Sequence, residues 1–140
     1  MCGEIDEQVI VGQDMRARLH GLTAGMDLPE PTGGGENPVN LAEATARGTY
    51  MDRIFRAGLA RSLQDIERAE DDETVDALAA QAIALARLAG FLAGQLPPEA
   101  DLFRALIEAI SAGHAEPQER VDAIRRAHDH HHGHSHDHHH

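Results

Sequence analysis

The last thirteen residues of the chain, 128–140, hold the side chains best suited to chemistry, because nine of them are histidine. Neutral imidazole binds nickel, cobalt, zinc and copper ions, and chelation needs several imidazoles within reach of one ion. Adjacent histidines in an extended chain, and His-x-His pairs such as His132/His134, supply that reach. The metal ligands predicted from this pattern are His128, Asp129, His130, His131, His132, His134, His136, Asp137, His138, His139 and His140.

This segment contains no apolar residue, so it cannot pack against a core, and we expect a disordered tail. Gly133 and Ser135 keep its backbone flexible, and Asp129 and Asp137 add carboxylate oxygens to the imidazoles. Several sets of ligands therefore compete for one ion. The sequence predicts one or more exchangeable sites for a divalent transition metal rather than one closed tetrahedral site.

In composition, residues 128–140 resemble the His-rich extensions of cytoplasmic nickel accessory proteins for urease and hydrogenase, and those of some zinc and cobalt handling proteins. The resemblance covers these thirteen residues only. It implies capture, storage or delivery of a metal ion. The rest of the chain has no P-loop, so it is unlike the GTPase members of those groups.

Two other interpretations compete with metal handling. One is a helical adaptor or regulatory module whose tail is incidental or is an affinity tag, although Asp, Gly and Ser interrupt the histidine run. The other is a metal-responsive helical transcriptional regulator. A formal net charge of -12 and the lack of clustered arginine disfavour it, because phosphate contacts need Lys or Arg. We therefore expect neither a nucleic acid nor a membrane partner.

We do not expect an enzyme, and we predict no catalytic or cofactor-binding residues. The chain has no lysine, which excludes Schiff-base chemistry on lysine and a Walker-type phosphate lysine. A single cysteine, Cys2, excludes an intrachain disulfide and a CxxC motif. We interpret His20 as a surface or half-buried residue, and His114 as a cap for a helix that ends at Gly113.

The remaining chain favours an all-α fold, because alanine is the commonest residue and loses no side-chain entropy in a helix. Residues 1–28 form an N-terminal segment with loosely helical spacing, and 29–37, with two prolines and three glycines, form a flexible linker. Residues 38–127 are predicted to form a small helical bundle of three main helices and a short fourth. The tail, 128–140, follows it.

The first main helix is predicted to begin at Asn37–Pro38, an N-cap residue followed by proline. Its apolar stripe recurs at intervals of three and four, and Gly58 on this stripe is a position where another helix could approach closely. The acidic run 70–73 ends the pattern and provides the next cap. The stripe consists of Met51, Ile54, Phe55, Leu59, Leu63 and Ile66.

The second main helix carries the clearest pattern, a heptad seam, and its additional apolar residues predict a central helix that touches two neighbours. The third runs from Glu99 to Ala112, with Gly113 as its stop, and Pro117 opens the short fourth. The seam consists of Val75, Leu78, Ala82, Leu85, Ala89, Leu92 and Leu96.

The surplus apolar surface of the second helix predicts a homodimer, through this helix or through the Met51–Ile66 helix, or a client protein, as the partner beside the metal ion. The N-terminal residues lack a basic stretch, and their apolar run, Val9–Val11, is too short for a signal peptide. No segment is expected to approach a membrane span. We therefore expect a cytoplasmic protein.

Overall fold

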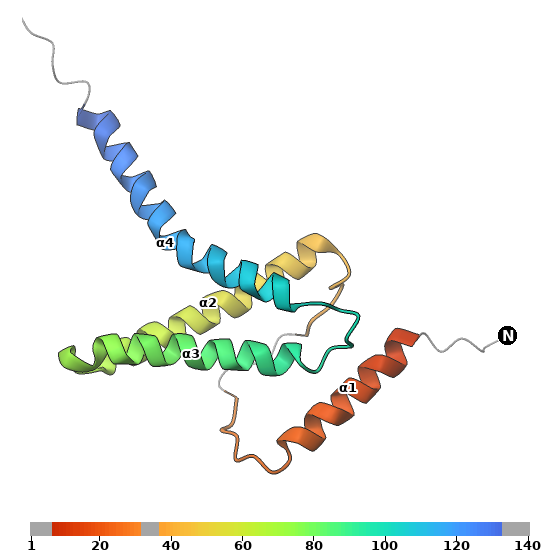
Figure 1. Ribbon diagram of the computed structural model, residues 1–140. Coiled ribbons are helices and arrows are strands. Elements are labelled where there is room, and N and C mark those ends of the chain that lie inside the picture. The colour runs from red at the N-terminus through yellow and green to blue at the C-terminus, as the bar shows by residue number, and fades with distance from the viewer. Residues whose placement is uncertain (1–6, 32–36, 133–140) are drawn as a thin grey trace, which may run out of the picture. The chain divides into compact units, whose positions relative to one another are not determined.

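The computed structural model describes residues 7–31 and 37–132, and within them the chain is all-α, as predicted (Figure 1). Its elements are α1 (Glu7–Thr23), α2 (Ala44–Arg68), a short 3-10 helix η1 (Asp71–Glu73), α3 (Thr74–Ala93) and α4 (Phe103–His132). The contacts divide the chain into two units, Met1–Gln95 and Leu96–His140. Helices α1, α2 and α3 belong to the first unit, and α4 belongs to the second.

Helix α1 confirms the helical spacing of the N-terminal segment and continues through Gly12 and Gly21. The hydroxyl of Thr23, its last residue, donates a hydrogen bond to the carbonyl of Leu19 at 2.8 Å. Residues 29–31 and 37 of the predicted linker 29–37 are non-helical, and residues 32–36 lie outside the described part of the chain.

The predicted start of the first main helix at Asn37–Pro38 is wrong, because α2 begins at Ala44, after Glu43 as its N-cap residue. The cause is Asn40, whose φ of 56° lies in the left-handed region that asparagine tolerates better than most residues. A helix cannot run through that conformation. The guanidinium of Arg47 donates to the carbonyl of Leu41 at 3.0 Å and holds this segment against the first turn of α2.

Helices α2 and α3 form a hairpin whose turn is short. The N–H of Ala69 donates to the carbonyl of Ile66 at 3.1 Å, and the N–H of Glu73 donates to the carbonyl of Glu70 at 2.9 Å. The acidic run 70–73 is exposed at the start of α3, where the helix dipole favours negative charge. Its predicted role as a cap is not fulfilled by side chains, since neither Glu70 nor Glu73 makes a capping hydrogen bond.

The two helices of the hairpin contact each other next to this turn. The partly buried side chains near the turn are mostly short or polar, and Ile66 is the one member of the apolar stripe of α2 among them. A Cβ on Gly58 would meet no atom within 4 Å, so the predicted close approach at this glycine is absent from the hairpin. The partly buried residues at this contact are Gly58, Ser62, Asp65 and Ile66 on α2, and Thr74, Ala77 and Gln81 on α3.

The sequence predicted that the apolar stripes are buried in a bundle core, but no described residue is buried. Leu85, in the middle of the predicted seam, is 52% exposed. The reason is the short extent of the contact with α2. Thr74, Ala77 and Gln81, near the turn, are partly buried, whereas Leu85 lies farther along α3. The seam therefore stays open to solvent within the first unit.

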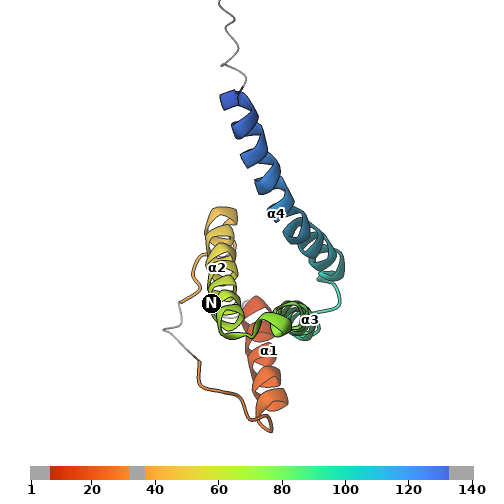
Figure 2. The ribbon, with the colours of Figure 1, turned by 90° about the vertical axis from the view of Figure 1, so that its left-hand side faces the viewer.

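The predicted third and fourth helices are one helix, α4, which runs through Gly113 and contains Pro117. A proline ring crowds the carbonyl four residues earlier and cannot donate a hydrogen bond to it, so it bends a helix or ends it. The carbonyl concerned here is that of Gly113. Here the outcome is a bend, since α4 changes direction about halfway along its length (Figures 1 and 2).

One segment of the described chain is long and apolar enough to cross a membrane by length and composition, namely Asp71–Ala93. This corrects the expectation that no segment approaches such a span. Apolar helices of water-soluble proteins meet the same criterion, so length and composition do not decide between the two environments.

Candidate metal-binding segment

The predicted metal ligands begin inside a helix rather than at the start of an extended tail. Helix α4 continues to His132, so it includes the first five residues of the predicted tail, 128–132. Residues 118–132 contain neither proline nor glycine, so nothing in them stops the helix before Gly133. The prediction of disorder is therefore wrong for residues 128–132, and it lies outside the described residues for 133–140.

Helical backbone changes how the first histidines can act. His128, Asp129 and His130 are exposed to solvent at the end of α4. Side chains one or two positions apart on a helix point in different directions, so adjacent histidines here cannot converge on one ion as they would in an extended chain. Among the described residues, no three His, Cys, Asp or Glu side chains are grouped closely enough to hold a metal.

The other predicted ligands lie outside the described residues. They are His134, His136, Asp137, His138, His139 and His140. Of the six His-x-His pairs in the sequence, three fall in this part, His132/His134 reaches into it, and His128/His130 and His130/His132 lie within α4.

Within the part of the chain that the structure describes, neither of the two histidines outside the tail is grouped with other possible metal ligands. His20 is exposed in the last turn of α1 and belongs to the other unit. His114 lies inside α4 and is exposed, so the prediction that it caps a helix end is wrong. It precedes His128 by fourteen positions, roughly 21 Å along a continuous helix, which is too far for both to bind one ion.

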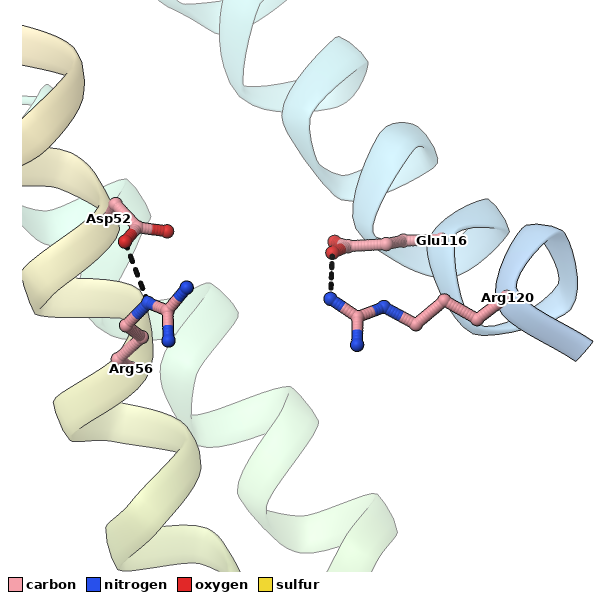
Figure 3. Close-up of polar contacts among 4 residues, drawn as sticks. All are labelled: Asp52, Arg56, Glu116 and Arg120. Carbon is pink, nitrogen blue, oxygen red and sulfur yellow. Dashed lines mark hydrogen bonds and ion pairs between the residues drawn. The ribbon is translucent and has the colours of Figure 1, made fainter. Parts of the chain in front are cut away.

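Charged side chains along the helices pair mainly with neighbours one turn away. On α2, the Nε of Arg56 lies 2.7 Å from a carboxylate oxygen of Asp52, and on α4 a guanidinium nitrogen of Arg120 lies 3.8 Å from Glu116 (Figure 3). Both pairs are largely exposed. They stabilise their own helices by tenths of a kcal/mol and build no binding site.

No protein-family model, no curated protein and no solved structure matches this chain.

Proposed function

We propose that this chain is a cytoplasmic metal-binding protein that captures, holds or hands over a divalent transition metal through residues 128–140. The observation that carries the proposal is the density of ligands, nine histidines and two aspartates among thirteen residues. Exposure of His128, Asp129 and His130 at the end of α4 supports it, because an incoming ion meets these groups directly.

The chemistry of such a segment suits transfer better than permanent storage. Imidazole binds nickel, cobalt, zinc and copper without demanding a rigid geometry from the protein. With more ligands than one ion needs, an ion exchanges between overlapping sets, and a receiving protein can take it one ligand at a time. Tight closed sites, by contrast, fix four ligands in one geometry. The helical part of the chain would dock to the receiver or to a second copy.

Titration calorimetry with nickel tests the proposal on the full chain. A variant in which all nine histidines of residues 128–140 are replaced by glutamine should lose most of the bound metal. The matched control replaces the other two histidines, His20→Gln and His114→Gln, and should bind as the original chain does. Equal stoichiometry in the original chain and the nine-fold variant would show that the metal is held elsewhere.

A second pair of variants separates the helical part of the segment from the rest. On α4 histidines one or two positions apart diverge and only those three or four apart share a face, so their replacement should reduce binding less than replacement of those that follow Gly133. The first variant replaces His128, His130, His131 and His132 by glutamine, and the second replaces His134, His136, His138, His139 and His140. A larger loss in the first variant would contradict the role assigned to the distal histidines.

Binding in solution does not distinguish a metal carrier from an adaptor with an incidental tail. The nine-fold glutamine variant, introduced in the native organism, provides that test. We expect a growth defect under metal limitation that added metal corrects. If growth under limitation is unchanged while binding in solution is lost, the chain is an adaptor and its tail is incidental.

A further inference from the structure

Helix α3 presents an apolar face that no described residue covers. Val75 and Ile83 are 76% and 72% exposed, and Leu78 and Leu85, further around the same side of the helix, are 53% and 52% exposed. Helix α2 approaches from the other side, where Thr74, Ala77 and Gln81 are partly buried. The uncovered face of α3 is defined here as Val75, Leu78, Ala82, Ile83, Leu85 and Ala86.

Two charged side chains border this face, and they are the charged residues of α3: Asp76 and Arg87. They lie eleven positions apart, about three helical turns, so both stand on the same edge, beside Ile83. Along the axis they are separated by roughly 16 Å, too far to pair with each other. Neither takes part in an ion pair among the described residues.

We propose that two copies of this chain associate through the uncovered face of α3, with the two α3 helices antiparallel and related by a twofold axis near Gln81 and Ala82. The midpoint between Asp76 and Arg87 lies between these two residues. In this arrangement Asp76 stands beside the partner's Arg87, and Arg87 stands beside the partner's Asp76. The uncovered face of α3 in one copy is thereby covered by the same face of the second copy.

The placement of opposite charges argues for this occupant. A twofold interface uses the same surface on both copies, so it must complement itself. One acid and one base on one edge of a helix complement themselves when the second helix is antiparallel. A parallel pair would place the charged edges of the two copies on opposite sides of the interface, where neither Asp76 nor Arg87 meets an opposite charge. The charges thus fix orientation and register, while the apolar face supplies affinity.

A membrane is the other environment that an apolar helix of this length could enter. Asp76 and Arg87 disfavour it, because each charged side chain within a spanning helix raises the free energy of insertion. Between two copies in water the same two residues become favourable. The proposal concerns α3 alone and does not depend on the histidine-rich tail.

Charge reversal tests the proposal by sedimentation equilibrium of the full chain. Either Asp76→Arg or Arg87→Asp creates two repulsive contacts per dimer and should raise the dissociation constant about tenfold or more. The double variant Asp76→Arg/Arg87→Asp restores both pairs, and its dissociation constant should lie within about twofold of that of the original chain. An equimolar mixture of the two single variants should form heterodimers for the same reason.

Controls with the same change in net charge lie on α2: Asp52→Arg and Arg56→Asp should leave the dimer unchanged. In a Cys2→Ser background, oxidation of Ala82→Cys, near the axis, should give covalent dimers. Ala93→Cys should not, since antiparallel copies hold that position far from itself. Cross-linking at both positions would indicate a parallel pair and overturn the proposed orientation.

Other results would overturn the proposal outright. One is a chain that is still monomeric at about 100 μM, a concentration above micromolar dissociation constants. The others are single variants that dimerise like the original chain and a double variant whose dimerisation is not restored. Binding of the monomer to neutral phosphatidylcholine vesicles would place α3 in a membrane instead. Circular dichroism of each variant verifies that its helices are intact, so that loss of association is not loss of folding.

Discussion

Gln81 on α3 and Ser62 on α2 are joined across the hairpin, where the Gln81 Nε2 donates a hydrogen bond to the backbone carbonyl of Ser62 at 3.4 Å. The two residues lie nineteen positions apart, and the bond is partly shielded from solvent. It ties the two helices close to their turn, away from Val75 and Ile83, the most exposed apolar residues of α3. The hairpin is thus held by a narrow polar and small-residue contact, and its apolar side chains remain open.

This link predicts a modest but measurable contribution to stability. Gln81→Ala should lower the free energy of unfolding by about 0.5–1.5 kcal/mol, the usual net value of one such hydrogen bond. Gln64→Ala, on the exposed side of α2, is the matched control and should change stability by at most a few tenths of a kcal/mol. Urea denaturation at a fixed protein concentration measures both. Equal effects would show that the bond across the hairpin contributes nothing.

Two glycines predict opposite results for the same substitution. Gly58 lies inside α2 and a Cβ there would meet nothing within 4 Å, so Gly58→Ala should stabilise the chain by about 0.5–1 kcal/mol. At Gly94, which follows α3, a Cβ would lie 3.3 Å from the carbonyl oxygen of Gly90. Gly94→Ala should therefore give no gain or a loss. Thermal unfolding compares them, and destabilisation by Gly58→Ala would reveal a helix packed against that position.

Pro117 predicts a straighter α4 when it is replaced. Pro117→Ala restores an N–H that can donate to the carbonyl of Gly113 and removes the ring that crowds it. The stability of the helix should rise by up to about 3 kcal/mol, and its bend should disappear. Residual dipolar couplings on either side of position 117 report the bend. Pro98→Ala, outside the helices, is the control; unchanged couplings in both variants would assign the bend to another cause.

Helical periodicity predicted α2 and α3 correctly because apolar residues at intervals of three and four report the helix directly. The ends were less predictable. Asn37–Pro38 has the composition of a helix start, but the left-handed backbone of Asn40 intervenes. Pro117 has the composition of a second start, but it is accommodated by a bend. Residues typical of a helix start therefore do not fix where a helix begins, because the backbone conformation of nearby residues also decides it.

Burial and the candidate site show a related limit. The seam around Leu85 identifies an apolar face but not the element that covers it, and within the first unit α2 packs beside this face. The charges at Asp76 and Arg87 are also visible in the sequence, but an analysis of apolar periodicity alone does not consider charged residues. In the tail, composition alone predicted the ligands, yet helix α4 reaches His132 and removes the extended backbone on which neighbouring histidines chelate.

Metal binding by the tail should depend steeply on pH. Imidazole must be neutral to bind a metal, and a histidine side chain in water titrates near about pH 6.5. Protons therefore compete with the ion as pH falls, and affinity for nickel should drop between about pH 7 and pH 5, with protons released on binding. Calorimetry in two buffers of different ionisation enthalpy measures the release. Affinity that stays constant to pH 5 would implicate carboxylates instead.

Metal should leave the stability of the helices unchanged, although it binds. A ligand stabilises a fold only when it prefers the folded chain to the unfolded one. The histidines beyond Gly133 lie after α4 in the sequence, and we expect them to bind equally well when α1–α4 unfold. The thermal midpoint of the full chain should therefore shift by less than about 1 °C with saturating nickel, whereas preferential binding to the folded chain at a hundred times Kd would add about 2.7 kcal/mol. A clear rise in the midpoint would mean that folded residues complete the site. His20→Gln and His114→Gln would then show which histidine is recruited, by abolishing the rise.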